Sequence, residues 1–215
     1  MDEQAAFLGK LAGGFSAAWR EAGADGDGSA ALTELTARYG ESHRHYHTLH
    51  HVAHVLDALH RHVGALEHPS DARLAVWYHD AVYAPAQQDN ERRSADLAAE
   101  QLLAAHVPVE VAARVHAMVL DTRHAAPATS PDGEYVVDAD LAILAAPAIA
   151  FDAYDTAIRL EYSFVPEAAY RAARRQVLQG FLDRPFIYQS AVFRKECEAA
   201  ARRNLERAVM RLGHV

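Results

Sequence analysis

The sequence contains one cysteine, no long apolar run and no basic run, and each absence excludes a class of protein. Because Cys197 is alone, no disulfide can form within the chain, and no cysteine cluster can hold zinc or an iron-sulfur centre. Any metal would therefore be bound through nitrogen and oxygen. No apolar stretch approaches the roughly 20 residues that a membrane-spanning helix needs, and residues 1–10 are acidic where a signal peptide is basic. We expect a cytoplasmic protein with no membrane partner.

Positive charge is also scarce. The chain has 21 Lys and Arg against 29 Asp and Glu, which gives a net charge of −8, and the two signs are mixed along its length. Affinity for nucleic acids comes mainly from neutralised phosphates, so we expect no nucleic-acid partner. A small molecule is the favoured partner. Helical proteins of this size often pair, so a homodimer is a further expectation.

The alternation of apolar and polar residues that marks β-strands is absent, and Ala, Leu, Glu and Arg dominate the long segments. The sequence therefore predicts an all-α fold, with roughly nine or ten helices in a single domain over residues 1–215. The predicted helices lie near residues 3–21, 30–39, 46–66, 71–83, 90–106, 108–122, 139–145, 148–162, 166–182 and 189–212. The stretch 125–134 contains Pro127, Pro131 and Asp132-Gly133 and is predicted to be a loop.

Histidine is unusually abundant, and eight of the 14 histidines lie between His43 and His62. Apolar residues recur there every three or four positions, which predicts one buried helix face made of Leu49, Val52, Leu56, Leu59 and Val63. His47 and His51 are one helical turn apart, so both imidazoles can reach the same point, as in metal-binding helices. A solvated helix face, or a metal- or pH-sensitive contact between subunits, is the alternative interpretation.

A second unusual feature is His79-Asp80, which lies inside the apolar segment 74–83. Burying an unpaired carboxylate costs several kcal/mol, so the charge must be paired, strongly hydrogen-bonded or bound to a cation. An arginine salt bridge is one solution. A divalent metal is the other, because neighbouring His and Asp side chains offer it one nitrogen and one anionic oxygen.

Two more acidic residues, Asp138 and Asp140, lie inside the apolar stretch 136–144. Asp138 could cap the helix that is predicted to follow. Asp140 lies two residues into that helix, where the helix dipole would favour it but capping alone does not explain it. We interpret Asp140 as a further oxygen ligand.

The order His51, then His79-Asp80, then Asp140 resembles the H…HD…D signature of the HD-domain metal-dependent phosphohydrolases. The flanking residues resemble one subfamily, described as predicted HD-superfamily phosphohydrolases, over about residues 39–188. They are Arg44-His-Tyr-His47, Ala75–Tyr83, Asp89–Ser94, Asp138–Leu141, Glu161-Tyr162 and Arg174. The resemblance implies a helical bundle that holds a divalent metal between three or more helices.

By this resemblance the metal ligands are His51, His79, Asp80 and Asp140. His47 and His50 are alternatives for the first position. Some HD enzymes bind a second metal through histidines between the HD pair and the last Asp, and His116 and His124 lie in that interval. Of these two, His124 is the better candidate, because it lies at a predicted helix end facing the loop. One ion and two ions both remain open.

The ligand types admit Mn, Fe, Co, Ni or Zn, whereas imidazole is a poor ligand for Mg. The implied reaction is attack of metal-activated water on phosphorus. Asp80 or Glu91 would accept or relay the proton. Arginines would hold the substrate phosphate, and the candidates are Arg44, Arg123, Arg159 and Arg174.

The resemblance therefore implies a phosphohydrolase that acts on a small phosphorylated metabolite, with a nucleotide favoured. A phosphodiesterase or (p)ppGpp-type hydrolase is one alternative, and a non-catalytic metal-binding or ligand-sensing module is another. Several aromatic residues could stack on a base, although aromatics at helical spacing are more often part of a core. They are Tyr46, Trp77, Tyr78, Tyr83 and Tyr135.

Overall fold

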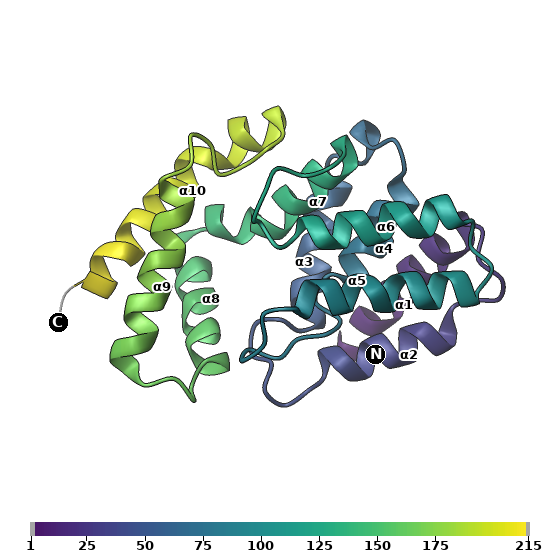
Figure 1. Ribbon diagram of the computed structural model, residues 1–215, viewed down its shortest axis with the longest axis horizontal. Coiled ribbons are helices and arrows are strands. Elements are labelled where there is room, and N and C mark those ends of the chain that lie inside the picture. The colour runs from purple at the N-terminus through teal and green to yellow at the C-terminus, as the bar shows by residue number, and fades with distance from the viewer. Residues whose placement is uncertain (1–2, 214–215) are drawn as a thin grey trace.

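The computed structural model describes residues 3–213 (Figure 1). This part of the chain contains ten α-helices, two short 3₁₀-helices and no strand, which confirms the predicted all-α fold. The helices are α1 (Glu3–Glu21), α2 (Ser29–Tyr39), α3 (Leu49–His60), η1 (Val63–Ala65), α4 (Pro69–Tyr78), α5 (Asn90–Ala104), α6 (Val109–Asp121), α7 (Pro131–Asp140), η2 (Leu141–Ala145), α8 (Ala148–Glu161), α9 (Glu167–Leu182) and α10 (Ala191–Gly213). Among residues 3–213, no helix has both the length and the apolarity needed to cross a bilayer.

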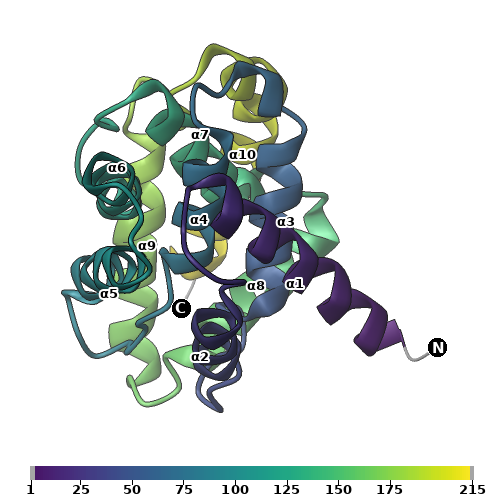
Figure 2. The ribbon, with the colours of Figure 1, turned by 90° about the vertical axis from the view of Figure 1, so that its right-hand side faces the viewer.

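Helix α4 is the centre of the larger part of the molecule. It contacts α1, α3, α5, α6 and α7, and Figure 2 shows it enclosed between α1 and α3 on one side and α5 and α6 on the other. Leu74, Trp77 and Tyr78 are almost completely buried, as the apolar character of this segment predicts. The end of α4, where His79 and Asp80 lie, is therefore held inside the protein.

Helices α8, α9 and α10 form a smaller group on the other side of the molecule (Figure 1). Helix α9 packs mainly on α10, and both α8 and α10 pack on η2, the short helix that directly follows α7. Residues from both groups face each other across the space between them. The candidate site described below lies at this junction.

The prediction of a loop over residues 125–134 is wrong at its end, because α7 begins at Pro131. The hydroxyl of Ser130 accepts a hydrogen bond from the Gly133 N–H at 3.0 Å, and Pro131 occupies the first helical turn, where a missing N–H costs nothing. Asp138 and Asp140 consequently lie in the last turn of α7, and of the helix predicted over residues 139–145 only the short η2 is found after them. The helix dipole disfavours a carboxylate there, so Asp140 depends on cationic partners from elsewhere in the fold.

The helix predicted over residues 71–83 also ends early, at Tyr78. Side chains from other elements satisfy the backbone groups that follow. Ser94 accepts from the Val82 N–H at 2.9 Å, and the Asn90 amide both accepts from and donates to the backbone of Ala84. These contacts replace the hydrogen bonds that a longer helix would have made. The chain therefore bends after Tyr78, and His79 and Asp80 lie at the start of this bend.

Candidate metal centre

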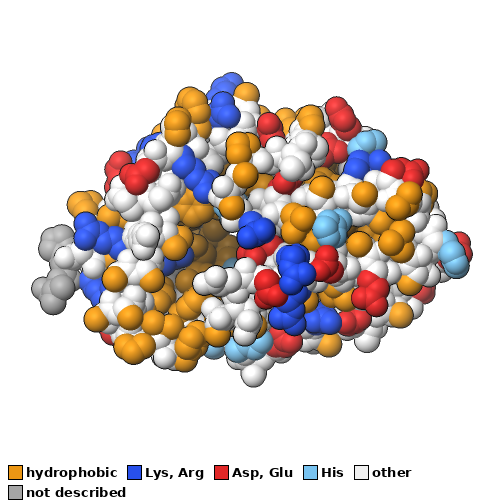
Figure 3. Space-filling model, viewed as in Figure 1, with side chains coloured by type: hydrophobic (Ala, Val, Ile, Leu, Met, Phe, Trp, Pro, Cys, Tyr) orange, Lys and Arg blue, Asp and Glu red, His pale blue; other side chains and the backbone are white. Residues whose placement is uncertain are grey.

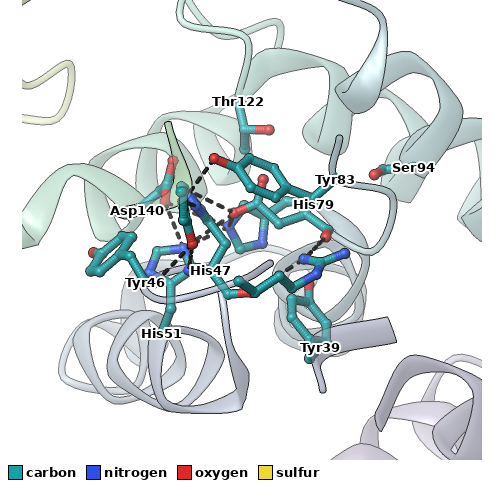
Figure 4. Close-up of polar contacts among 12 residues, drawn as sticks. Tyr39, Tyr46, His47, His51, His79, Tyr83, Ser94, Thr122 and Asp140 are labelled. Atoms are coloured by element: carbon teal, nitrogen blue, oxygen red, sulfur yellow. Dashed lines mark hydrogen bonds and ion pairs between the residues drawn. The ribbon is translucent and has the colours of Figure 1, made fainter. Parts of the chain in front are cut away.

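Three helix ends bring four side chains together (Figure 4). His51 lies in the first turn of α3, His79 and Asp80 follow the end of α4, and Asp140 ends α7. The Nε2 atoms of His51 and His79 are 3.0 Å apart. Asp140 Oδ1 lies 3.2 Å from His51 Nε2, and Asp80 Oδ2 lies 3.0 Å from His79 Nε2. His51, His79 and Asp140 thus form a group that could hold a metal ion.

The hydrogen bonds of His79 suit it to metal binding. Its Nδ1 atom donates to the carbonyl oxygen of Val76 at 2.7 Å, so Nδ1 keeps a proton in either charge state and Nε2 is the nitrogen that faces the cluster and would lose its proton to a metal. A backbone or carboxylate oxygen on the far nitrogen is what orients metal-binding histidines. Both His79 and His51 are 2% exposed. Two buried nitrogens and two carboxylates that converge at one point fit a divalent cation.

The charges of the cluster depend on one another. Burial raises the pKa of the Asp80 carboxyl, but His79 and His47 outweigh burial and hold it well below its usual range. The pKa of Asp140 is likewise held low against burial by His124, His51 and His79. Burial lowers the pKa of His79, yet the charge of Asp80 raises it well above its usual value. Imidazolium protons thus balance the carboxylates here, and a divalent ion would replace them.

The alternative of an arginine salt bridge does not hold. Within residues 3–213, Asp80 forms ion pairs with His47, His51 and His79. Asp140 forms them with His51, His79 and His124. The ion-pair partners of both carboxylates are therefore histidines, which, unlike arginine, can lose their charge and bind a metal.

His47 lies at the edge of the cluster and is held by Glu161, at the end of α8. Its Nδ1 atom donates to Glu161 Oε2 at 2.7 Å, and its Nε2 atom lies 3.9 Å from Asp80 Oδ2. The orientation is that of a metal-binding histidine with a carboxylate behind it. His50, the other alternative for the first ligand position, points away and stacks on Phe7 with ring centroids 4.7 Å apart.

Glu161 belongs to the residues that resemble the subfamily, but the sequence indicated no role for it, and the structure gives it a supporting one. Its Oε1 atom accepts from the backbone N–H groups of His45, Tyr46 and His47 at 2.8, 2.8 and 3.0 Å, and the Tyr83 hydroxyl donates to Oε2 at 2.8 Å. Burial raises the pKa of Glu161, but His47 and the backbone donors lower it to about 2. These backbone partners lie 114 to 116 residues away in sequence, so a local pattern could indicate Glu161 itself but not what it binds.

His124 is held in an uncommon backbone conformation beside Asp140. Its φ angle is +54°, which residues other than glycine rarely adopt. Arg184 donates to the His124 carbonyl oxygen at 2.6 Å, and His124 Nε2 donates to Asp140 Oδ2 at 3.0 Å. Asp140 is thus fixed from both sides, with Oδ1 toward His51 and Oδ2 toward His124. This geometry suits His124 to orienting Asp140.

A pocket of about 580 Å³ opens from the cluster. Figure 3 shows it as a hollow with Lys and Arg side chains at its edge. Its lining includes Glu91, predicted to handle a proton, and Arg123 and Arg174, predicted to hold the phosphate, and Arg184 is a further lining residue that the sequence did not indicate. The pocket is large enough for a metabolite several times the size of a phosphate group.

The assignment of Arg44 to the substrate phosphate is wrong. Its side chain is fully buried, and it donates to the carbonyl oxygens of His47, Asp80 and Ala81 at 3.2, 2.7 and 3.1 Å. Arg44 does not line the pocket. Its guanidinium instead ties the segment before α3 to the bend after α4, so it positions the residues of the cluster.

Two other candidates also lie away from the pocket. Arg159 pairs with Glu167 at 2.9 Å on the outside of the helices, and His116 faces Asp96 at 3.1 Å on α5. Asp138 does not join the cluster or cap the helix that follows it. It accepts from the N–H groups of Gln189 and Ser190, both at 2.7 Å, and so fixes the start of α10.

The aromatic candidates divide into two sets. Tyr46 and Tyr83 line the pocket, whereas Trp77 and Tyr78 are core residues and Tyr135 does not reach it. Three further aromatics from the smaller helix group line the pocket without having been predicted to do so: Tyr154, Tyr162 and Phe181. The chain was compared with protein-family models, with curated proteins and with solved structures, and none of these comparisons gave a match.

Proposed function

We propose that this chain is a metal-dependent phosphohydrolase of the HD-domain type that acts on a small phosphorylated metabolite, with a nucleotide the favoured class. The observation that carries the proposal is the meeting of His51, His79, Asp80 and Asp140 at the base of an arginine-lined pocket. These are the residues that the sequence places in the order of the HD signature. A metal beside cations in a concave site suits phosphate chemistry.

The ion would be held by His51, His79 and Asp140, with Asp80 completing the set. Mixed imidazole and carboxylate ligands favour Mn, Fe, Co, Ni or Zn over Mg. When bound, such an ion supplies Lewis-acid chemistry, since it makes a neighbouring water more acidic and polarises a phosphoryl oxygen. One ion accounts for the four ligands, with His124 acting on Asp140 from outside.

The phosphate group would be bound by Arg174 and Arg123. Arg174 is 10% exposed and is held by Asp155, which accepts from its Nε atom at 3.1 Å. Its guanidinium also lies over the ring of Tyr154, 5.2 Å from the centroid. A guanidinium fixed in this way offers its remaining donors to an anion without first losing side-chain freedom. Arg123 is exposed at the rim and would meet the phosphate first.

Proton transfer would fall to Glu91 and Asp80. Glu91 lies in the first turn of α5 and lines the same pocket as Asp80 and Tyr83. It is outside the metal ligand set, so it is free to take a proton and to return it to the leaving group. Asp80 is 16% exposed, and its position beside the cluster allows it to orient an attacking water.

The test uses protein purified without a metal-affinity column. We expect elemental analysis to find about one transition-metal ion per chain. We expect a panel of phosphomonoesters, phosphodiesters and nucleotides to be hydrolysed with the metal found. Asp80→Ala should lower kcat/KM by about a hundredfold or more. Asp96→Ala, an exposed aspartate on α5 outside the pocket, is the matched control and should leave it unchanged.

Hydrolysis that survives in Asp80→Ala at the level of the parent would overturn the assignment. Metal bound in stoichiometric amount without turnover of any phosphate ester would instead indicate the non-catalytic alternative, a metal-binding or ligand-sensing module.

A further inference from the structure

A second concave region adjoins the metal pocket on the far side of His124. Its volume is about 410 Å³, and it shares two lining residues, His124 and Arg184, with the metal pocket. The rest of its wall comes from residues 125–127 and Glu134, from segment 185–189 between α9 and α10, and from Arg194 in the first turn of α10. A ligand bound at the metal could extend past Arg184 into this second pocket.

Arg184 lies between the two pockets and has no carboxylate partner among residues 3–213. Its Nη2 atom donates to the His124 carbonyl oxygen at 2.6 Å, and its guanidinium stacks on Phe181 at 4.5 Å from the ring centroid. The described contacts leave the Nε and Nη1 donors without a protein acceptor. The charge of Arg184 is therefore fixed in place but not neutralised.

Arg194 repeats this arrangement in the second pocket. Its Nε and Nη2 atoms donate to the carbonyl oxygens of Tyr188 and Gln189 at 2.8 and 2.6 Å, and it stacks on Phe186 at 4.5 Å from the ring centroid. It forms no ion pair within the described residues. Asp138 is near enough to feel its charge, but both oxygens of Asp138 are bound to backbone N–H groups. The Nη1 donors of Arg194 are thus available to a ligand.

The wall that carries these groups is fixed by other side chains. Arg202 donates to the carbonyl oxygens of Leu182, Arg184 and Pro185 at 3.0, 2.8 and 3.1 Å. Glu198 accepts from the Ile187 N–H at 3.0 Å. Arg202, whose role is structural, pairs with Glu198 at 2.7 Å. It differs in this from Arg184 and Arg194, which have no carboxylate partner among the described residues. Binding an anion at Arg184 and Arg194 would require little ordering of the protein.

We infer that the second pocket binds an additional anionic group of the substrate, so that the substrate carries two phosphate groups, or a phosphate and another acid, at separate positions. One group would lie at the metal with Arg174, and the other between Arg184 and Arg194. The inference rests on the proposed function, because it takes the ligand of the metal pocket to be a phosphate ester. The shared wall at Arg184 favours one extended ligand over a separate anion.

The experiment measures binding by calorimetry to the metal-loaded protein and so needs no turnover. The probes are 1,4-butanediol, 1,5-pentanediol and 1,6-hexanediol bisphosphates, each compared with the monophosphate of the same carbon chain. We expect at least one bisphosphate to bind about tenfold or more tightly than its monophosphate. Arg194→Gln should remove this preference and leave the monophosphates unchanged, because Arg194 lies outside the metal pocket. Arg20→Gln, at an exposed position on α1 outside both pockets, is the matched control.

A second variant covers the case in which Arg194→Gln does not fold. Glu134 is an acidic residue that lines the second pocket, and no hydrogen bond or ion pair of its side chain occurs among residues 3–213. Glu134→Gln should tighten bisphosphate binding severalfold, because it removes a repulsive charge. Monophosphates should again be unaffected.

Equal binding of bisphosphates and monophosphates at every chain length would overturn the inference. So would a loss in Arg194→Gln that is the same for both kinds of probe. Inorganic phosphate provides the remaining arm. Suppose that two phosphate ions bind per chain, that Arg194→Gln removes one of them, and that bisphosphates bind no more tightly than monophosphates. The second pocket then takes a separate anion, and the inference fails. A bisphosphate preference in a protein that hydrolyses no ester would support the second pocket while rejecting the proposed function.

Discussion

The residues of the cluster are set in place by hydrogen bonds made on the side away from it. His79 gives its Nδ1 proton to a backbone carbonyl, and His47 gives its own to Glu161. Each ring therefore turns its Nε2 atom inward, toward Asp80. Selection of the tautomer by an outer oxygen is what makes an imidazole a good ligand. The orientation of the histidines in the candidate centre thus depends on groups that lie outside the cluster.

Glu161 provides a residue-scale prediction about pH. Its pKa is about 2 in the fold against an ordinary value of 4.5, so the ionised form stabilises the native state. This stabilisation is complete above about pH 4.5 and is lost as the pH falls toward 2. We expect Glu161→Gln to lower the free energy of unfolding by about 2–3 kcal/mol at pH 7. Urea denaturation at a series of pH values should show the difference shrinking below pH 4.5.

Glu167→Gln, an exposed glutamate at the start of α9, is the control, and we expect little change from it. A deficit in Glu161→Gln that stays constant from pH 7 to pH 2 would show that the charge of this carboxylate does not contribute.

At the scale of elements, the centre depends on where helices end. Helix α3 contributes its first turn, while α4 and α7 contribute their last residues or those just beyond. Close approach of the backbone fixes the start of α7, since a Cβ atom at Gly133 would lie 2.6 Å from Asp121 Oδ2. The length of α7, from Pro131 to Asp140, then sets the position of Asp140 in the cluster.

The cap of α7 gives the prediction at this scale. Ser130→Ala removes the acceptor for the Gly133 N–H and should lower the free energy of unfolding by about 1 kcal/mol. Equilibrium urea denaturation measures the change, with the exposed Ser163→Ala as control. Metal content should be retained, because Asp140 lies at the opposite end of the helix. An unchanged unfolding midpoint would mean that Pro131 alone sets this helix start.

At the scale of the whole molecule, a bound ion would join three helices of the larger group next to the junction with α8–α10. Ligands that bind only the folded chain stabilise it by mass action, by about 2.7 kcal/mol when the free ion is at 100 times its dissociation constant. We expect metal to raise the melting temperature by roughly 5–10 °C at pH 7.5, as measured by calorimetry with and without chelator. His79→Ala should abolish this shift.

The same shift should depend on pH in a fixed direction. The pKa values of His51 and His79 are raised in the fold, chiefly by Asp140 and Asp80 acting against burial. Protons therefore compete with the ion for the same nitrogens. The metal-induced rise should shrink as the pH falls from 7.5 toward 5. A rise that grows at low pH would contradict the assignment of these histidines as ligands.

The sequence by itself determined the helical fold and singled out the acidic residues of the candidate metal centre. Apolar residues at helical spacing predict α3 and α4, and carboxylates inside apolar segments mark Asp80 and Asp140 as unusual, because burying an unpaired charge is costly. The metal role of these residues stays a prediction. Arginines carry no such signal, because the residues around Arg44, Arg174 and Arg184 do not show which guanidinium faces a pocket and which is internal.

Only the tertiary structure decided which atoms meet. Arg44 became an internal anchor and Arg184 a pocket residue because helices far apart in sequence pack side by side. Glu161 reaches a loop more than 100 residues earlier for the same reason. Local sequence sets helix periodicity, which is a short-range property. The direction of a long polar side chain is set by acceptors that other elements bring near, and those positions exist only once the helices have packed.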